Sequence, residues 1–577
     1  MTHADRPADG GWAWPVALTL LAALVVLAAG IGLRSPWPAD EPRFAQIARE
    51  MVESGQWLFP TRGGEPYPDK PPVFIWLVAL FYLATGQLKV AFLLPSALAG
   101  LGTLWLVHDI GRRLWGRDVA RYALLILLFT PQFFMQAKSA QLDALVTFWI
   151  TLGCYGLLRH FVLGPSWGWY CGAFAAMALG IMTKGVGFLP ALMLIPFALW
   201  GPRSGAGPSG KVWGARSWLG LLVLLGTLAL WLGPMLWTVA ASGDEALRAY
   251  RDNILFHQTA GRYANPWGHI NAWHYLFTVA IPAVWLPLLV LMLTQWRRLG
   301  RLLKEDSTAR VLFTWALMVL VFFSLSRGKR VVYILPALPM LCLVAGALWR
   351  RALDEGGTRA SALALRAVVV LLGLGLAALG AVAWLHPALL GPKVDDYGDV
   401  LANIALPVLG MGVGVLALAA ATWRRDALAS LAAVSLLCWL ALSCWVWPAM
   451  DAHRTPKALM QELERAVDAR HEVGLLQFKE QFLLFSRRPL THFSVLAPVA
   501  EQERNAWRWM QEDPSRVLLV PDSLDLACFD MHRLRVLGNA HRQDWGLLDA
   551  GAMKPGCEPP LKALRYTWRP QRLDILD

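Results

Sequence analysis

The chain has 577 residues, of which 56% are hydrophobic and only 16% are charged, and it contains 30 tryptophans. Soluble domains carry about 25% charged residues and lack repeated long apolar runs, so this composition excludes an ordinary soluble protein. The formal net charge of +13 does not indicate nucleic-acid binding, because arginine and lysine cluster in short segments between apolar runs, as in the cytoplasmic loops of membrane proteins. Such segments are also suited to anionic lipid headgroups.

The apolar segments predict a polytopic α-helical membrane protein with about thirteen spans, many of them near the ~20 residues that cross a hydrocarbon core. With a cytoplasmic N-terminus, the loops that begin at Gly111, Arg159, Gly201, Trp296, Trp349 and Thr422 are all basic and cytoplasmic. The loops 34–88, 138–143, 241–274 and 387–401 then face outward, as does the chain after Trp447. The predicted spans are 13–33, 89–110, 119–137, 144–163, 168–184, 186–200, 217–240, 275–295, 309–325, 332–349, 362–386, 402–422 and 427–447.

The first apolar segment has one alternative interpretation, a secretory signal peptide cleaved near "PWPAD". Its apolar stretch has about twenty residues, whereas a signal core has 7–15. The length therefore favours an uncleaved span.

Two short helices are predicted in the outward loop 34–88. In "EPRFAQIAREMVESG" the apolar residues Phe44, Ile47, Ala48 and Met51 share one helical face, with Asp40 and Glu41 at the N-terminal end. The apolar stretch Pro71–Gly86 is short and opens with two prolines, and a span there would reverse every later loop. We expect it to form a juxtamembrane or re-entrant helix.

The composition changes after Trp447, so we expect a transmembrane domain over 1–447 and a small outward-facing α/β domain over 448–577. A helix capped by Thr455 is predicted over "TPKALMQELERAVDA", another over "EQERNAWRWMQ", and strands over "HEVGLLQF", "SRVLLVPD" and "LRVLGNA". Cys528 and Cys557 lie in this domain, on the oxidising side, and we expect a disulfide between them. Two free thiols are the alternative.

Charged groups near a membrane usually have a function, and many of those in this chain fall on the outward side. Carboxylates there can deprotonate or orient a hydroxyl, and cations can hold a phosphate leaving group. A site at the lipid boundary suits a donor whose phosphate carries a long isoprenoid tail. The outward set is Asp40, Glu41, Arg43, Asp69, Lys70, Asp143, Lys184, His257, Arg262, Arg327, Lys329 and Arg330.

Each member of this set has a structural alternative. Asp40 and Asp143 are suited to capping the helices that follow them. Lys70, Lys184 and Arg262 are suited to reaching lipid headgroups without binding a substrate, and His257 is an unremarkable loop histidine on its own. The concentration on one side of the membrane favours the functional interpretation.

The stretch "ADEPRFAQIAREMVESGQWLFPTRGGEPYPDKPP" resembles the first periplasmic loop of the ArnT-like glycosyltransferases, which are related to the protein O-mannosyltransferases. The resemblance extends through "QLDALVTFWITLG", "IMTKGVGFLP" and "GKRVVYILPALPML", and so covers most of the membrane region. It implies a GT-C fold with thirteen spans, periplasmic juxtamembrane helices and a C-terminal periplasmic domain. It also implies sugar transfer from undecaprenyl phosphate to lipid A phosphates, which confers polymyxin resistance.

The resemblance also implies roles for individual residues. Asp40 and Asp143 match essential acidic residues, and Lys70 matches the lysine of a Lys-Pro-Pro motif. Arg262 matches an arginine that binds the donor phosphate. Tyr67 and Tyr333 match tyrosines that line the cavity, and Asp69 and His257 fall where the family has a glutamate and a histidine that bind zinc. Glu41, Arg43 and Lys184 are substrate-binding candidates because they belong to the outward charged set, and no family match is assigned to them.

Two departures from the family pattern concern the metal and the substrate. Asp69 is one methylene shorter than the family's glutamate, and two protein ligands are fewer than the three or four that zinc sites usually have. Together with the proline in "DEPRF", this difference hints at another sugar or acceptor.

The sequence thus predicts an inverting, polyprenyl-phosphate-dependent glycosyltransferase in the bacterial inner membrane, acting as a monomer with its active site and C-terminus in the periplasm. The expected donor is undecaprenyl phosphate-linked 4-amino-4-deoxy-L-arabinose or a related sugar, and the expected acceptor is lipid A. One alternative acceptor is a protein hydroxyl or another envelope glycan. Another class of function is a lipid-linked sugar transporter or flippase, but transporters place charges at mid-membrane and have related halves.

Overall fold

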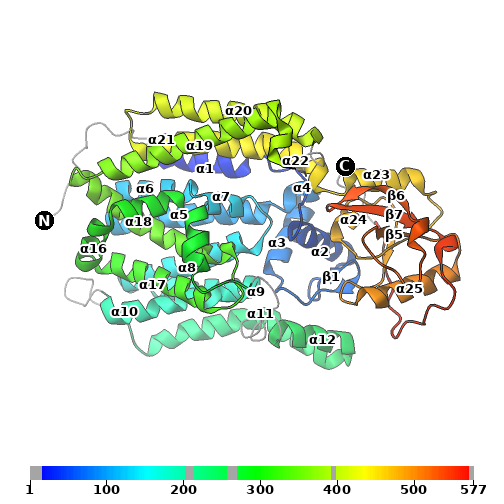
Figure 1. Ribbon diagram of the computed structural model, residues 1–577. Helices are drawn as coiled ribbons and strands as arrows, with labels where there is room; N and C mark the ends of the chain where they lie inside the picture. The colour runs from blue at the N-terminus through cyan, green and yellow to red at the C-terminus, as the bar shows by residue number, and fades with distance from the viewer. Residues whose placement is uncertain (1–15, 202–211, 257–269, 392–397, 571–577) are drawn as a thin grey trace. The chain divides into compact units, whose positions relative to one another are not determined.

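The computed structural model describes residues 16–201, 212–256, 270–391 and 398–570 (Figure 1). The chain divides into two compact units. The first, helical unit comprises Met1–Gly30, Ser96–Leu230 and Thr259–Val446, and the second, mixed unit comprises Ile31–Pro95, Trp231–Gln258 and Trp447–Asp577. The interpretation of 1–447 as a catalytic domain and 448–577 as a separate domain stays a prediction.

The helical unit consists of apolar helices. Its elements are α1 (Val16–Ala28), α5 (Leu94–Trp115), α6 (Arg117–Leu128), α7 (Pro131–Ala137), α8 (Leu142–Phe161), α9 (Trp167–Lys184), η1 (Val186–Met193), α10 (Leu194–Trp200), η2 (Ala215–Ser217), α11 (Trp218–Ser242), which continues into the mixed unit, η4 (Leu276–Ala280), α14 (Ile281–Val284), α15 (Leu286–Thr294), α16 (Trp296–Glu305), α17 (Ser307–Leu325), η5 (Val331–Ala337), α18 (Leu338–Asp354), α19 (Arg359–Leu385), η6 (Pro387–Leu390), α20 (Gly398–Ala421), α21 (Ala427–Ala441) and η8 (Leu442–Val446).

Every predicted span coincides with helical structure, but the helices differ in length. Among the described residues, eight helices are long and apolar enough to cross a membrane, or up to ten if each bent pair forms one span. The bent pairs are α6 with α7, at 69°, and η4–α14 with α15, at 111°; Pro131 begins α7, and Pro287 lies in the first turn of α15. The polytopic architecture is therefore confirmed, and the number thirteen stays a prediction.

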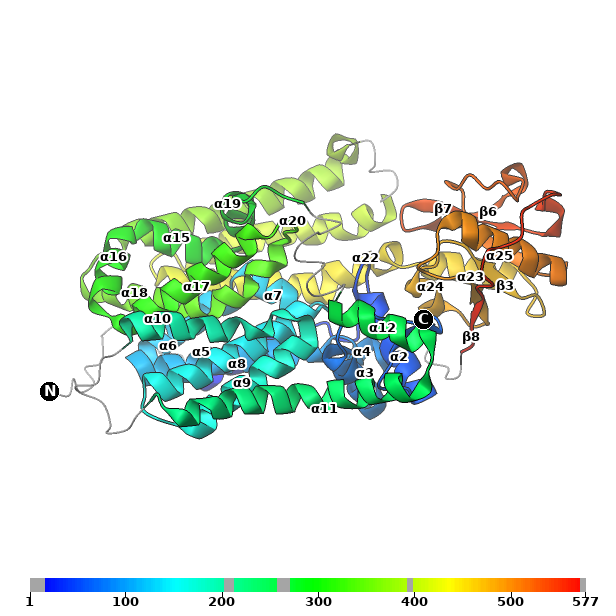
Figure 2. The same cartoon turned by 90° about the horizontal axis from the view of Figure 1, so that it is seen from below.

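Small residues bring neighbouring helices of this unit close together. A side chain at Gly412 of α20 would lie 2.2 Å from the backbone nitrogen of Ala377 in α19, and α19 and α20 run side by side in both views (Figures 1 and 2). At Gly346 of α18, a side chain would meet the Val119 carbonyl of α6 at 2.7 Å. Small residues drive such helix packing in membranes, where lipid tails remove the hydrophobic force.

Several of the basic loops predicted to be cytoplasmic contact one another within the helical unit. Arg350 donates to Asp118 at 2.7 Å, Arg351 pairs with Glu305 at 2.7 Å, and the Trp115 indole donates to Asp306 at 2.7 Å. These contacts bring the loops after α5, α16 and α18 to one end of the unit. This arrangement agrees with the prediction that these loops lie on the same side of the membrane.

The mixed unit contains short helices and a sheet. Its elements are α2 (Glu41–Ser54), β1 (Thr61–Arg62), β2 (Glu65–Pro66), α3 (Val73–Thr85), α4 (Leu88–Ala91), α12 (Glu245–Asp252), α22 (Trp447–Arg454), α23 (Lys457–Ala466), β3 (Val473–Leu475), α24 (Glu480–Phe485), β4 (Leu490–His492), α25 (Val499–Glu512), β5 (Val517–Pro521), η9 (Met531–Arg533), β6 (Arg535–Ala540), β7 (Gln543–Leu548), η10 (Ala550–Ala552) and β8 (Tyr566–Trp568).

The two helices predicted in loop 34–88 are present as α2 and α3. The predicted apolar face of α2 is buried, and Gly55 ends the helix with a φ of 71°, a conformation that glycine adopts without steric cost. Phe44 of α2 packs edge-on against Phe74 of α3, with ring centroids 5.2 Å apart. α3 has only 13 residues, as expected for a helix that does not span.

The C-terminal residues form a six-stranded mixed sheet in the order β6-β7-β5-β3-β4-β8, which lies between α23 and α25 in Figure 1. β3 is parallel to β4 and β5, and the outer pairs are antiparallel. Trp509 and Met510 of α25 pack in its core with Leu518 and Val520 of β5. The expected disulfide is present, with the Cα atoms of Cys528 and Cys557 5.2 Å apart.

One predicted cap in this unit is wrong. The N-cap residue of α23 is Pro456, and the Thr455 hydroxyl instead donates to the Asp451 carbonyl at 2.9 Å. The helix begins one residue later than predicted, so Thr455 lies before the N-cap, and no side-chain oxygen accepts a capping hydrogen bond at the start of α23.

Candidate active site

Glu41 holds the turn that leads into α2. Arg34 donates to both of its carboxylate oxygens, with Nη2 2.8 Å from Oε1, and the Trp37 backbone N–H donates to Oε2 at 2.8 Å. Arg34 and Glu41 are both buried, so the pair excludes water from the end of the helix. A contact of Glu41 with substrate stays a prediction.

Asp40 immediately precedes α2, but its side chain does not cap the helix. None of the described backbone N–H groups of α2 donates a capping hydrogen bond to its carboxylate, so the capping alternative is wrong. Oδ1 lies 3.7 Å from Nη1 of Arg43, and about a quarter of the Asp40 side chain is exposed. Asp40 therefore combines solvent access with a neighbouring cation.

Arg43 and Arg62 share one buried carboxylate. Nε of Arg43 lies 3.1 Å and Nη1 of Arg62 lies 2.9 Å from the same oxygen, Oε1 of Glu480. Burial opposes the charge of Arg43, but its neighbours, among them the carboxylates of Glu480 and Asp40, outweigh this effect and raise its pKa. Arg43 is therefore a fixed positive charge beside Asp40.

Tyr67 is buried next to this group. The Arg62 guanidinium lies over its ring, 5.5 Å from the centroid, and burial is the main cause that raises the pKa of its hydroxyl. Tyr67 therefore stays neutral and can donate a hydrogen bond across the physiological pH range.

Lys70 and Asp69 lie in the segment between the β1–β2 hairpin and α3. Both are half-buried, and the Lys70 ammonium donates to the Asp69 carbonyl at 3.1 Å. This contact holds the tip of the lysine side chain back against the turn in front of α3.

In the helical unit, Asp143, Lys184 and Tyr333 form a second group of polar side chains. Lys184 at the end of α9 forms an ion pair with Asp143 in the first turn of α8. Its ammonium lies 4.9 Å from the ring centroid of Tyr333 on η5. The N-cap residue of α8 is Gln141. Asp143 therefore pairs with the Lys184 ammonium and does not cap the helix.

The metal site predicted at Asp69 and His257 stays a prediction. His257 and Arg262 lie outside the described residues. Within 16–201, 212–256, 270–391 and 398–570 there is no group of three His, Cys, Asp or Glu side chains able to hold a metal ion. A zinc site needs three or four ligands, so the described residues do not fit one, and no chemical step is assigned to a metal.

Three residues near the predicted set were missed in the sequence. Glu480 binds Arg43, and Arg62 binds the same oxygen of Glu480. Tyr250 of α12 is buried, packs edge-on against Phe59 with centroids 5.2 Å apart, and has a pKa raised first by burial and then by Tyr67. No sequence pattern connects Glu480 with Arg43, because 437 positions separate them.

Each of the two groups combines a carboxylate with a cation. Asp40 with Arg43 in the mixed unit, and Asp143 with Lys184 in the helical unit, provide acceptors that orient a hydroxyl and donors that neutralise an anion. Lys70 adds a further cation in the mixed unit. This is the chemistry of group transfer from a phosphate leaving group.

Known proteins resemble the chain in sequence and in fold. A family model described as dolichyl-phosphate-mannose-protein mannosyltransferase matches residues 69–237. An undecaprenyl phosphate-alpha-4-amino-4-deoxy-L-arabinose arabinosyl transferase of Pseudomonas paraeruginosa is 30% identical over 459 residues, 75% of this chain and 76% of that protein. Such a transferase of Pseudomonas fluorescens is 28% identical over 522 residues, 88% of this chain and 85% of that protein.

The structural comparison identifies the fold. The crystal structure of ArnT from Cupriavidus metallidurans bound to undecaprenyl phosphate matches with a TM-score of 0.72 over 95% of this chain and 100% of that chain, at 21% identity. The shared architecture is a polytopic membrane GT-C fold. The chain belongs to the family of the undecaprenyl phosphate-alpha-4-amino-4-deoxy-L-arabinose arabinosyl transferases and is a glycosyltransferase.

Proposed function

We propose that the protein is an inverting glycosyltransferase that moves 4-amino-4-deoxy-L-arabinose, or a related sugar, from undecaprenyl phosphate to a phosphate of lipid A. The observation that carries this proposal is the 30% identity with an arabinosyl transferase over three quarters of both chains. The carboxylate–cation groups around Asp40 and Asp143 support it, because they suit a phosphate leaving group. The proposed outcome is a less negative lipid A and resistance to polymyxin.

The proposed reaction exchanges one bond for another at the anomeric carbon. An acceptor oxygen forms a bond to this carbon while the bond to the donor phosphate oxygen breaks, and the phosphate departs with its polyprenyl chain. Asp40 orients the acceptor oxygen, or takes its proton when the acceptor is a hydroxyl. A lipid A phosphate is already largely ionised, so Asp40 then acts by positioning.

The departing phosphate needs cations rather than a general acid. Lys70 and Arg262 serve this purpose in the proposal, with Tyr67, Arg43 and Tyr333 as further substrate contacts. Asp143 orients Lys184, because the two already form an ion pair. These assignments follow the residue matches in the sequence and the geometry of the described ones.

We place the reaction at the periplasmic face of the bacterial inner membrane, with a cytoplasmic N-terminus and a periplasmic C-terminal domain over 448–577. The basic loops that meet at one end of the helical unit support this orientation. The protein acts as a monomer in this proposal, with residues 1–447 as the catalytic domain.

Mass spectrometry of lipid A tests the proposal in cells with the wild-type gene, with Asp40→Asn and with the gene deleted. We expect a pentosamine-sized addition only with the wild type. Identical lipid A in all three strains would exclude lipid A as the acceptor.

A protein hydroxyl or another envelope glycan is the second candidate acceptor. The match of residues 69–237 to protein mannosyltransferases favours it, as does Asp69 in place of the family's glutamate. Comparison of periplasmic glycoproteins and glycans in the same three strains distinguishes the candidates, since this acceptor predicts a glycan that is lost in both mutant strains.

A further inference from the structure

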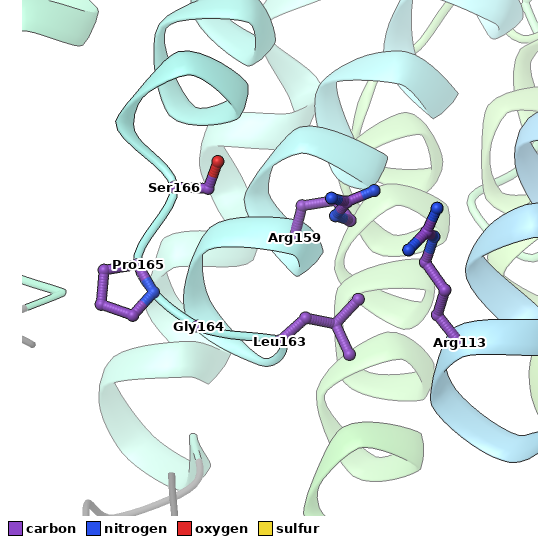
Figure 3. Close-up of a pocket in the computed structure, with 6 residues that line it drawn as sticks. All are labelled: Arg113, Arg159, Leu163, Gly164, Pro165 and Ser166. Carbon is purple, nitrogen blue, oxygen red and sulfur yellow. The ribbon is translucent and has the colours of Figure 1, made fainter. Parts of the chain in front are cut away.

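A hollow of about 500 Å³ opens between the end of α5 and the connection from α8 to α9 (Figure 3). Arg113 comes from the last turn of α5 and Arg159 from the last turn of α8. Their guanidinium groups point toward one another in Figure 3. The remaining lining residues are Leu163, Gly164, Pro165 and Ser166.

On the α5 side of this hollow, the carboxylate of Asp109 binds the arginine side chains. Arg113 Nε donates to its Oδ2 at 2.6 Å and Arg112 Nη2 to its Oδ1 at 2.9 Å. The Tyr155 hydroxyl also donates to Oδ2, at 2.7 Å. Both oxygens of Asp109 are therefore occupied.

Arg159 is held by aromatic rings instead of by a carboxylate. Its guanidinium lies 5.2 Å from the ring centroid of Trp169 and 5.8 Å from that of Tyr155, and Nη1 donates to the Tyr155 hydroxyl at 3.0 Å. The contacts of Arg159 among the described residues are to these aromatic side chains and not to a carboxylate. A guanidinium carries five N–H donors, so most of them remain for a ligand, in an orientation already fixed by the rings.

The charges around the hollow define what it can bind. Arg112, Arg113 and Arg159 bring three positive charges against one negative charge on Asp109. The C-termini of α5 and α8 each add roughly half a negative charge and the N-terminus of α9, capped by Ser166, adds roughly half a positive charge, which leaves at least about one positive charge uncompensated. A monoanion with several oxygen acceptors satisfies both the charge and the donors, and a phosphodiester is such a group.

The position of the hollow indicates where such a group comes from. α5 and α8 are both long and apolar enough to span a membrane, so their ends lie at the level of lipid headgroups. Leu163 and Pro165 offer an apolar wall beside the arginines. We propose that this hollow binds a phosphate ester through Arg113 and Arg159, a role separate from sugar transfer, and that the headgroup of an anionic phospholipid supplies it.

The test uses delipidated full-length protein in detergent and counts bound lipid by native mass spectrometry. The probes are phosphatidylglycerol, zwitterionic phosphatidylcholine, and soluble glycerol 3-phosphate, which lacks acyl chains. We expect wild-type protein to prefer phosphatidylglycerol to phosphatidylcholine, and Arg159→Gln to weaken phosphatidylglycerol binding about ten-fold, as for loss of a charge-assisted hydrogen bond. Arg297→Gln is the control, because Arg297 is also an arginine but is exposed on α16, outside the hollow.

The outcomes distinguish the source of the phosphate from the existence of the site. If glycerol 3-phosphate displaces phosphatidylglycerol and its binding also depends on Arg159, the phosphate site stands with a soluble ligand as its source. Equal phosphatidylglycerol binding by wild type, Arg159→Gln and Arg297→Gln overturns the proposal. Equal binding of phosphatidylglycerol and phosphatidylcholine by the wild type, with no glycerol 3-phosphate binding, overturns it even if the variant does not fold.

Discussion

Arg43 and Glu480 form an ion pair at 3.1 Å across 437 positions of sequence, and the same arginine lies 3.7 Å from Asp40. The oxygen of Glu480 that binds Arg43 also binds Arg62. The C-terminal part of the chain therefore fixes a positive charge beside the carboxylate to which we assign the reaction. Glu480 acts through Arg43, so it is a positioning residue.

Replacing this carboxylate tests the relationship. We expect Glu480→Gln to lower kcat/KM for sugar transfer by about ten- to a hundred-fold, because small displacements of a positioned group have effects of this size. The neutral amide keeps the shape but no longer neutralises two arginines. Transfer kinetics of purified protein measure the effect, and Glu462→Gln is the control, since the pair of Glu462 with Arg465 is exposed. Equal kinetics for the two variants would contradict the positioning role.

The pair of Asp143 and Lys184 predicts a non-additive loss of stability. Lys184→Gln leaves the buried Asp143 carboxylate without its ammonium partner, and breaking such a pair costs about 3 kcal/mol. The double variant Asp143→Asn/Lys184→Gln removes both charges and should lose less than the two single variants together. Thermal unfolding in detergent of the wild type, Asp143→Asn, Lys184→Gln and the double variant provides this double-mutant cycle. Strictly additive losses would mean that the two side chains act independently.

The sequence predicted the helices well because long apolar runs and basic loops are strong local signals. It also predicted the buried face of α2 and the pairing of Cys528 with Cys557. It missed β4, β7 and β8, because these segments mix polar and apolar residues and lack a continuous apolar run like that of β5. The roles of Glu480 and Arg62 depend on contacts between distant segments, which no local pattern encodes.

Buried histidines predict that the mixed unit loses stability as the pH falls. The Nε2–H of His492 donates to the Gly63 carbonyl oxygen at 2.8 Å, and a side chain at Gly63 would meet the His492 ring at 2.6 Å. Burial lowers the pKa of His492 to about 4, against 6.5 for a free histidine, and likewise lowers the pKa of His541 to about 4. Between these values the unfolded chain binds protons that the folded one does not, so stability falls from pH 6.5 toward pH 4.

Thermal unfolding between pH 7 and pH 4 measures this dependence. His492→Gln should flatten the part of the curve that comes from this residue, whereas the exposed His471→Gln should leave it unchanged. An identical slope in wild type and His492→Gln would contradict the lowered pKa of His492, because it would mean that folding does not change its proton binding.

The disulfide predicts a thiol count and a stability loss. Under denaturing, non-reducing conditions, five cysteines should react with a maleimide, because Cys154, Cys171, Cys342, Cys438 and Cys444 are free. The Cys528→Ser/Cys557→Ser variant should lose about 3 kcal/mol, as for a bridge across 29 positions. Seven reactive thiols in protein isolated from cells without reductant would exclude the bridge.

The most direct test of the central claim is sugar transfer by the purified protein in vitro. Undecaprenyl phosphate-linked 4-amino-4-deoxy-L-arabinose and lipid A are supplied in detergent, and modified lipid A is quantified by mass spectrometry. The account predicts product with the wild type, and a rate at least about a hundred-fold lower with Asp40→Asn, since Asp40 positions the acceptor. A control variant at an exposed capping residue, Asp244→Asn, should transfer like the wild type. Equal rates for wild type and Asp40→Asn would contradict the assigned role of Asp40, and no product with any variant would contradict the donor or acceptor.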